Sequence, residues 1–201
     1  MKIRKRNRLV QGIGVNDADY ITEKRVNKKT IWFCPFYQKW KDMLKRCYSE
    51  NYQRKYSTYK GCTVCNEWLT FSNFKAWMET QDWQGNQLDK DILFEGNKLY
   101  SPETCVFVDS SVNSFLLDCA ARRGEYPIGV HWDKRINKYV AQVRVNNKRK
   151  HLGCFNDPND AHLTWLKAKQ EALLILIEDV EDQRIADALL KRYRQDDVLT
   201  K

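Results

Sequence analysis

The chain has 201 residues and a formal charge of +9, with 42% hydrophobic and 12% aromatic residues. This content is enough for a folded core, which excludes a globally disordered chain, and no apolar run is long enough for a transmembrane helix. The strongly basic balance points to a polyanionic partner, above all nucleic acid, and the alternative is a merely soluble basic surface.

The first 30 residues are basic, show only weak hydrophobic periodicity and include Gly12 and Gly14. We therefore expect a loosely packed N-terminal arm. Five of the first eight residues are Lys or Arg, but no apolar segment follows them, so the sequence does not predict a signal peptide. The expected location is the cytoplasm.

The middle of the chain alternates between helical and strand-like patterns. Apolar residues at three- and four-residue spacing predict helices, and short β-branched or aromatic runs between Gly and Asn clusters predict strands. In chain order, the predicted elements are a helix over 36–48, a loop over 48–59, a short extended segment over 63–68, a helix from residue 70, a turn over 81–87, strands over 88–94 and 105–108, and a helix over 110–117.

A charged segment with a glycine, residues 122–125, marks a boundary before a new strand pattern. Three strand-like runs follow, over 128–132, 138–145 and 149–155, and then two helical segments, the second over 181–194. Asp157 and Pro158 suit the cap and the first position of the first of these helices. Its Ala and Trp spacing predicts a face that packs on a three-stranded antiparallel sheet.

Seven cysteines, an odd number in a chain expected to be cytoplasmic, argue against disulfides. Cys62 and Cys65 have the spacing of metal ligands, and Cys47 and Cys105 could complete a four-thiolate zinc site if the fold brought them together. The alternative is that these thiols are small buried hydrophobic side chains.

Side chains with oxygen ligands gather in a short unit between residues 88 and 113. Hydrolysis of a phosphodiester with one metal needs a carboxylate that holds a hard cation, a base that activates water, and a polar residue that orients the base or the phosphate. The candidates are Asp89, Asp91, Asn97, Glu103 and Asn113.

A wider frame surrounds these residues. It consists of Trp40-x-x-Met43-x-x-x-Cys47, Val64-Cys65-x-Glu67-Trp68, Phe71-x-x-Phe74, Leu88-Asp89-Lys90-Asp91, Gly96-Asn97, Tyr100-x-Pro102-Glu103-x-Cys105 and Asn113. The frame resembles the core of HNH, or His-Me finger, endonucleases, especially short phage and mobile-element proteins. The resemblance implies a ββα metal finger in which Asp89 and Asn113 bind Mg²⁺ or Mn²⁺, Asn97 is the central Asn of the loop, and Lys90 stands at the position of the general-base His.

Lys90 leaves two interpretations open. A lysine ammonium normally holds its proton at neutral pH and is a poor base. Catalysis by Lys90, Asp91 and Asn97 would need surroundings that favour the neutral amine, or transfer of the proton to a neighbouring acid such as Asp91. Otherwise the finger binds DNA phosphate and does not cut.

A second concentration of charge lies between residues 131 and 151. Alternation along 138–145 predicts that Tyr139, Ala141 and Val143 face the helix, so polar side chains of the three strands should gather on the opposite face. The expected DNA-contacting residues are His131, Lys134, Arg135, Lys138, Gln142, Arg144, Lys148, Arg149, Lys150 and His151. A twisted antiparallel ribbon can present such side chains to base edges in the major groove. The alternative is an ordinary solvated strand face.

Several motifs of this segment occur together. They are Gly129-Val130-His131-Trp132, Lys138-Tyr139-Val140-Ala141-Gln142-Val143-Arg144, Arg149-Lys150-His151-Leu152-Gly153-Cys154-Phe155, and a helix with Asp160-Ala161 and Ala168. The segment looks like an integrase-type DNA-binding domain of the APETALA/ERF family. The resemblance implies that the outward side chains of the strands contact the groove. His151 stands where plant members usually have an aromatic residue, so base preference does not carry over.

We therefore predict an α+β protein in three parts. They are a basic arm over 1–30, an HNH-like nuclease domain over 31–122 with a ββα metal finger and flanking helices, and an APETALA/ERF-like domain over 126–201, in which a three-stranded antiparallel sheet packs on one helix and a C-terminal helix follows. The resemblances imply a phage homing endonuclease that nicks or cleaves double-stranded DNA in the cytoplasm of an infected bacterial host cell. Two alternatives are a catalytically degenerate DNA-binding regulator and an inhibitor that binds a host defence protein.

Overall fold

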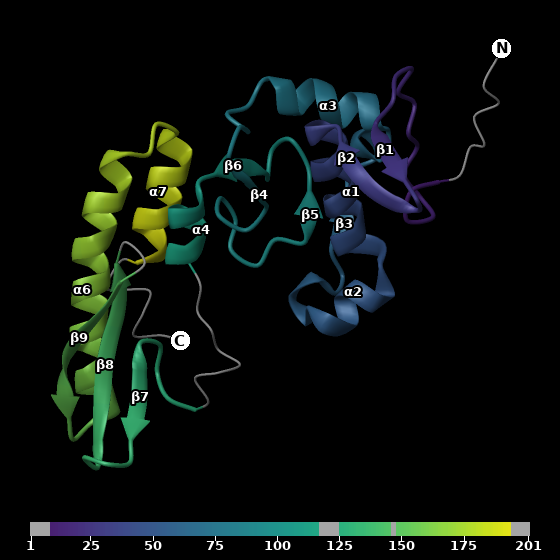
Figure 1. Cartoon of the computed structure of the whole chain (residues 1–201). Coiled ribbons are helices and arrows are strands. Elements are labelled where there is room, and N and C mark those ends of the chain that lie inside the picture. Colours follow the sequence, from purple (N-terminus) through teal and green to yellow (C-terminus); the bar gives the residue numbers. More distant parts are fainter. Residues whose placement is uncertain (1–8, 117–124, 146–147, 194–201) are drawn as a thin grey trace. The chain divides into compact units, whose positions relative to one another are not determined.

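The structure is a computed structural model, and it describes residues 9–116, 125–145 and 148–193. The chain divides into two compact units, Met1–Val108 and Asp109–Lys201, each with its own core. The described residues form six α-helices and four small sheets, which confirms a mixed α+β chain (Figure 1). None of these helices combines the length and the apolar character that crossing a membrane requires.

The first unit is built from short elements. In chain order they are β1 (Glu23–Val26), β2 (Lys29–Phe33), α1 (Pro35–Tyr48), α2 (Glu50–Lys55), the 3₁₀ helix η1 (Ser57–Tyr59), β3 (Thr63–Val64), the 3₁₀ helix η2 (Glu67–Leu69), α3 (Phe71–Glu79), β4 (Gln87–Asp89), β5 (Leu99–Tyr100) and β6 (Val106–Val108). β1 pairs with β2 and β4 pairs with β6, both antiparallel, while β3 and β5 are parallel.

Aromatic side chains of α1, η2 and α3 form the core of the first unit. Trp40, Trp68 and Phe74 are at most 1% exposed. Trp40 donates its indole N–H to the carbonyl of Trp68 at 2.6 Å, and the rings of Trp68 and Phe74 meet edge-on with centroids 5.1 Å apart. The helices predicted over 36–48 and from residue 70 are thus confirmed, because their apolar stripes meet in this core.

Two segments are more ordered than their composition suggests. The expected loop over 48–59 contains α2 and η1, and the expected loose arm over 1–30 contains β1 and the start of β2. Ser49 caps α2 by accepting a hydrogen bond from the backbone N–H of Tyr52, whose ring lies 4.7 Å from that of Tyr56 one turn later. Local capping and aromatic pairing outweigh the polar composition here. Residues 1–8 of the expected arm lie outside the described residues.

The strand predicted over 88–94 is wrong in its extent, because β4 ends at Asp89. The Asp89 Oδ1 atom accepts hydrogen bonds from the backbone N–H groups of Asp91, at 2.6 Å, and Ile92, at 2.9 Å. A carboxylate that bonds the backbone two and three residues ahead turns the chain and ends the strand. A loop over 90–98 therefore replaces the second half of the predicted strand.

The second unit contains one sheet and three helices in its described part. The elements are α4 (Ser110–Phe115), β7 (Val130–Asp133), β8 (Lys138–Val145), β9 (Lys148–Phe155), α6 (Pro158–Glu178) and α7 (Gln183–Arg192). The strands form an antiparallel sheet in the order β7-β8-β9, which confirms the predicted sheet. Asp157 caps α6 by accepting from the N–H of Asn159 at 2.6 Å, as the sequence predicts.

The inward face of the sheet packs on α6. Ala141 and Val143 of β8 are at most 2% exposed and share a core with Trp165 and Leu166 of α6. Tyr139 packs partly buried against the same core. The predicted inward set of Tyr139, Ala141 and Val143 is confirmed by these contacts. Val140, which points to the opposite face, is also buried, at 4% exposure.

Gly129, just before β7, stands where the second unit leaves no room for a side chain. Its φ is +82°, and a Cβ atom would lie 2.1 Å from the Trp165 indole. We expect Gly129→Ala to lower the free energy of unfolding of this unit by about 2–4 kcal/mol, because backbone strain and the clash add. Urea denaturation followed by circular dichroism measures the loss. Gly85→Ala has a similar φ with open space around it and should cost less; an equal cost would contradict the steric explanation.

α4 belongs to the second unit, whereas the predicted nuclease domain extends to residue 122. Lys169 of α6 is 6% exposed, donates to the carbonyl of Phe115 at 2.6 Å and lies 3.4 Å from the centroid of the Phe115 ring. Burial lowers the pKa of Lys169 to about 8. The Phe115 ring also meets Tyr193 edge-on, with centroids 5.5 Å apart. These contacts tie the end of α4 to the C-terminal helices and explain why the units divide after Val108.

Candidate functional site

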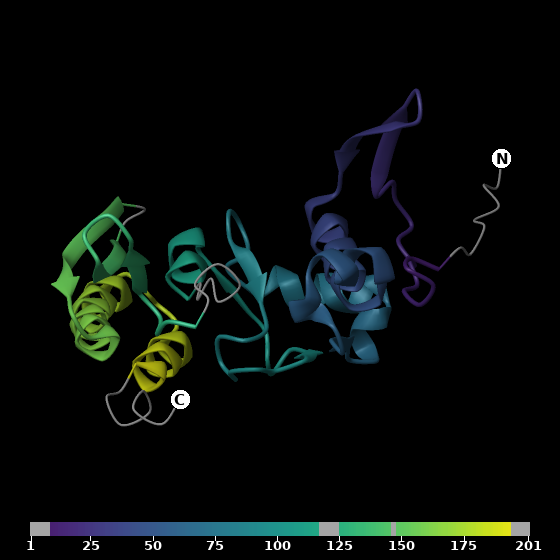
Figure 2. The ribbon, with the colours of Figure 1, turned by 90° about the horizontal axis from the view of Figure 1, so that it is seen from below.

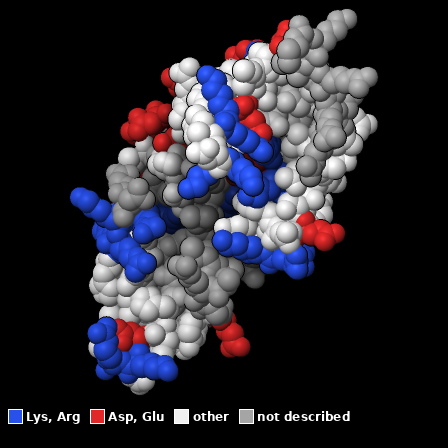
Figure 3. Space-filling view, turned by 45° about the vertical axis from the view of Figure 1, so that its right-hand side comes forward, with Lys and Arg blue, Asp and Glu red and all other residues white. Residues whose placement is uncertain are grey.

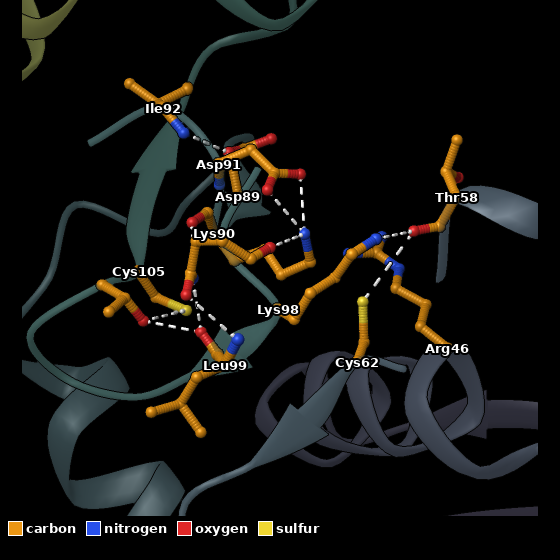
Figure 4. A network of polar contacts seen from close by, with 12 residues as sticks. Arg46, Thr58, Cys62, Asp89, Lys90, Asp91, Ile92, Lys98, Leu99 and Cys105 are labelled. Atoms are coloured by element: carbon orange, nitrogen blue, oxygen red, sulfur yellow. Dashed lines mark hydrogen bonds and ion pairs between the residues drawn. The ribbon is translucent and has the colours of Figure 1, made fainter. Parts of the chain in front are cut away.

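The Lys90 ammonium is buried in the loop that follows β4. Its side chain is 4% exposed, and Nζ donates to both carboxylate oxygens of Asp91, at 2.6 and 2.7 Å, and to the carbonyl of Asn97, at 2.6 Å (Figure 4). The ring of Tyr100 lies 5.9 Å away. The loop thus places three acceptor oxygens around Nζ, two of them on one carboxylate. Lys90 is therefore held inside the loop as a hydrogen-bond donor to Asp91 and to the Asn97 carbonyl.

Two more polar side chains, those of Asn97 and Asp89, bind the backbone of the loop. Asn97 donates its side-chain amide to the carbonyls of Lys90, at 2.9 Å, and Leu99, at 2.6 Å, and its side-chain oxygen accepts from the N–H of Leu99. Asp89 holds the start of the loop through the two backbone N–H groups that end β4. The loop is thus a closed network of hydrogen bonds with one internal cation, Lys90.

This arrangement does not fit a divalent cation held by the loop. The Asp91 carboxylate already faces the Lys90 ammonium, and a second cation beside it would be repelled. Within the described residues, no three His, Cys, Asp or Glu side chains come together as a metal site. Asp89 belongs to the first unit and Asn113 to the second. The predicted ligand pair, and with it Mg²⁺ or Mn²⁺, stays a prediction.

Two basic residues of α1 hold β4 and were not among the predicted site residues. Lys39 donates to the carbonyl of Asn86 at 2.6 Å, and Arg46 donates to that of Leu88 at 3.3 Å. Burial lowers the pKa of Lys39, and the nearby Arg46 guanidinium adds to the effect. A spacing of seven residues places both on one helix face, which is the sequence signal that could have found them.

The four candidate zinc ligands all lie in the first unit. Cys47, Cys62 and Cys105 are buried in its core, and Cys65 is partly buried. Burial raises the pKa of Cys47 and of Cys105 to about 12, so both thiols are protonated at neutral pH. Zinc binds thiolates, and these surroundings therefore favour the alternative of small buried hydrophobic side chains. Zinc stays a prediction.

The face of the sheet opposite α6 carries five of the predicted DNA-contacting residues. We call it the outer sheet face, and its members are His131, Gln142, Arg144, Arg149 and His151. The register pairs Gln142 with His151 and, in the next outward row, Arg144 with Arg149. Gln142 is half-buried and the other four are exposed. The structure thus brings together residues that are up to 20 positions apart in the sequence.

A bulge in β9 decides which residues share the outer sheet face. Ala141 pairs with Gly153, but the next residue of β8, Gln142, pairs with His151. Leu152 is therefore the extra residue of β9, and it packs partly buried against the α6 core. The bulge restores outward positions to Arg149 and His151, which simple alternation from Gly153 would direct inward.

The register corrects the expectation for Lys148 and Lys150. They pair with Val145 and Val143, which pack in the core formed with α6. Partners in an antiparallel pair share a face, so both lysines lie on the α6 side of the sheet, as exposed side chains of an edge strand. They add positive charge near the outer sheet face but do not belong to it.

The remaining three predicted residues lie at the other end of the sheet. The Arg135 guanidinium donates to the Asp133 carboxylate at 2.8 Å, and this bond lowers the pKa of Asp133 to about 2. Lys138 donates to the side-chain oxygen of Asn156, and Lys134 is exposed. Asp133 and Asn156 of the chain itself thus bind two of the three cationic side chains at this end. This end of the sheet is therefore a weaker anion site than its composition suggests.

Comparison of the chain with models of known protein families, with curated proteins and with solved structures finds no match. The two family resemblances therefore rest only on the residues quoted for them. The loop around Lys90 and the outer sheet face are the features of the described residues that bear on function.

Proposed function

We propose that this protein binds double-stranded DNA through the outer sheet face. The observation that carries the proposal is that Arg144 and Arg149 are direct register partners on that face. Two like charges opposite each other on a sheet repel and cost stability. A phosphate or a guanine edge between them would remove this cost, because a guanidinium binds either one through two parallel hydrogen bonds.

The neighbouring row supports base contacts as well as phosphate contacts. Gln142 and His151 lie side by side next to the arginine pair, and glutamine suits adenine as arginine suits guanine. The net charge of +9 favours a polyanion. Figure 3 shows Lys and Arg side chains gathered in separate clusters on the surface in view. An antiparallel sheet with this outward set can lie against the major groove.

Binding without cleavage is the form of the proposal that the loop around Lys90 favours. At the position expected for the general base, Lys90 is buried and donates to Asp91 and to the Asn97 carbonyl, and the Asn97 side chain is bound to the backbone. Metal-dependent nicking by Asp89 and Asn113 is the second candidate, supported by the resemblance of the frame around them. A regulatory role would require only that the protein binds its partner, whether DNA or a host defence protein, without cleaving DNA.

The test is a titration of the full chain with a fluorescent DNA duplex at several salt concentrations. We expect the logarithm of the affinity to fall linearly with the logarithm of the salt concentration, because each neutralised phosphate releases counterions. In a parallel series, supercoiled plasmid with Mg²⁺ or Mn²⁺ should stay intact. Absence of duplex binding would refute the proposal. Nicking that disappears in Asp89→Ala would favour the nuclease candidate instead.

A further inference from the structure

The hairpin of β1 and β2 is a two-stranded antiparallel ribbon with one irregularity, because the register passes from Trp32 to Thr30 and skips Ile31. Asn27 and Lys28 form its turn, with φ values of +48° and +65°. Two successive positive φ values are those of a type I′ turn, whose twist matches that of a two-stranded ribbon. At the base, the N–H of Cys34 donates to the carbonyl of Thr22 at 2.9 Å. The ribbon is therefore shaped before any partner arrives.

Only the base of the ribbon is fixed to the rest of its unit. Lys41 of α1 forms an ion pair with Glu23 at 3.2 Å and lies 4.8 Å from the centroid of the Phe33 ring, which packs against the core. Beyond this base, β1 and β2 contact mainly each other. Figure 2 shows the ribbon standing off α1 and α3. Its outer part is open to a partner on both sides.

The outer part combines positive charge with exposed apolar surface. Its four basic residues are Lys24, Arg25, Lys28 and Lys29. The acid of the ribbon, Glu23, is paired with Arg25 at 2.7 Å as well as with Lys41. Ile31 is 63% exposed and Trp32 is 43% exposed, and the Lys24 ammonium lies 5.5 Å from the centroid of the Trp32 ring.

We propose that the β1–β2 ribbon is a second DNA-contacting element, on a different unit from the outer sheet face. The inference rests on the proposed function, which supplies the duplex, and adds a second contact to it. Four cations against a single acid, Glu23, favour a polyanion. The major groove of B-DNA, about 12 Å wide, admits a two-stranded ribbon. Because the ribbon is preformed, little conformational entropy is lost when it docks.

The basic and the apolar side chains of the ribbon would contact different parts of the duplex. The lysines and Arg25 contact phosphates and position the ribbon, as cationic side chains do in most DNA complexes. Trp32 and Ile31 bring apolar surface that can pack on sugars or on thymine methyl groups in the groove. The ribbon thus adds mainly sequence-independent affinity, whereas the outer sheet face carries the guanidinium and amide groups that discriminate bases.

The test compares two triple variants of the full chain. Lys24→Gln/Arg25→Gln/Lys29→Gln removes three charges from the ribbon. Lys45→Gln/Lys55→Gln/Lys60→Gln removes three charges from exposed lysines elsewhere in the same unit. We expect the ribbon variant to lose about tenfold or more in duplex affinity and its salt slope to fall by about two to three, since each phosphate contact contributes about 0.9. The control variant should keep most of its duplex affinity and most of its salt slope. Circular dichroism checks that both are folded.

The outcomes separate this inference from the proposed function. A wild-type chain without duplex affinity overturns both. The ribbon proposal alone is overturned if the wild type binds DNA, Arg144→Ala/Arg149→Ala loses this binding and the ribbon variant keeps it. It is also overturned if the ribbon variant and the control triple variant lose affinity equally. Residual binding in the arginine double variant that disappears when the ribbon changes are added supports the ribbon. Vesicles of phosphatidylserine and phosphatidylcholine form a parallel series: a ribbon variant that loses vesicle binding and keeps DNA binding assigns the ribbon to a lipid surface and overturns the proposal.

Discussion

Replacing Arg144 and Arg149 together with Ala should lower the affinity for duplex DNA by about one to two orders of magnitude. Both guanidinium groups lie on the outer sheet face, and no other residue of that face carries a permanent positive charge. The fold should be unaffected, because both side chains are exposed and the double change removes two like charges from paired positions of the sheet. Fluorescence anisotropy with a labelled duplex, at matched salt, measures the loss.

The matched control removes two charges from the same unit. Lys167 of α6 and Lys191 of α7 are exposed and lie on helices, so Lys167→Ala/Lys191→Ala should change the affinity by no more than about twofold. A third variant, Arg144→Lys/Arg149→Lys, keeps the charge and loses the planar fork. We expect it to retain the salt dependence while losing preference among duplex sequences. If the control weakens binding as much as the alanine pair, the sheet is not the site.

Lys90→Met should lower the free energy of unfolding of the first unit by about 1–3 kcal/mol. Methionine has a similar volume but leaves the carbonyl of Asn97 without its donor and Asp91 without its cation. The Asp91 side chain is 45% exposed, so water takes over part of the lost interaction and keeps the cost moderate. The comparison is Lys98→Met, since Lys98 is exposed and donates to the carbonyl of Thr58 at 2.8 Å. It should change the unfolding free energy by less than about 0.5 kcal/mol in urea denaturation.

The variant Lys90→His tests whether Lys90 has a structural role or only stands in place of the general base of a competent nuclease. An imidazole is shorter than a lysine side chain, so it cannot serve the Asp91 carboxylate and the Asn97 carbonyl together. We expect this variant to be destabilised and to leave plasmid DNA intact in the presence of Mg²⁺ or Mn²⁺. Metal-dependent nicking by Lys90→His, abolished by adding Asp89→Ala, would show instead that the finger is competent once it has a base.

The parts of this fold that the sequence predicts are those with regular apolar spacing. α1, α3 and the β7–β9 sheet bury side chains at helical or alternating intervals, and each of them agrees with its prediction in kind. The hairpin of β1 and β2 was missed because it buries little, and its turn at Asn27 and Lys28 lacks the glycine that usually marks a type I′ turn.

Composition could not reveal the state of Lys90. A lysine between two aspartates is typical of a solvated turn, and its burial depends on a carbonyl seven residues later, at Asn97. Nor could alternation alone assign Lys148 and Lys150, because the bulge at Leu152 reverses the pattern beyond it. In both cases a contact between residues that are not neighbours in sequence decides the outcome.

The bulge at Leu152 decides which side chains of β9 lie on the outer sheet face. If β9 paired with β8 without it, Lys148 and Lys150 would turn outward, and Arg149 and His151 would turn toward α6. The β9 part of this face would then carry ammonium groups, which hold phosphates but distinguish bases poorly, in place of a guanidinium and an imidazole, while Arg144 of β8 would stay outward. Moving a single irregularity along this edge strand, with no change to a core residue of β8, would thus shift the protein from selective towards indiscriminate binding. The partly buried Leu152 opposes that slip, since it would lose its place against α6.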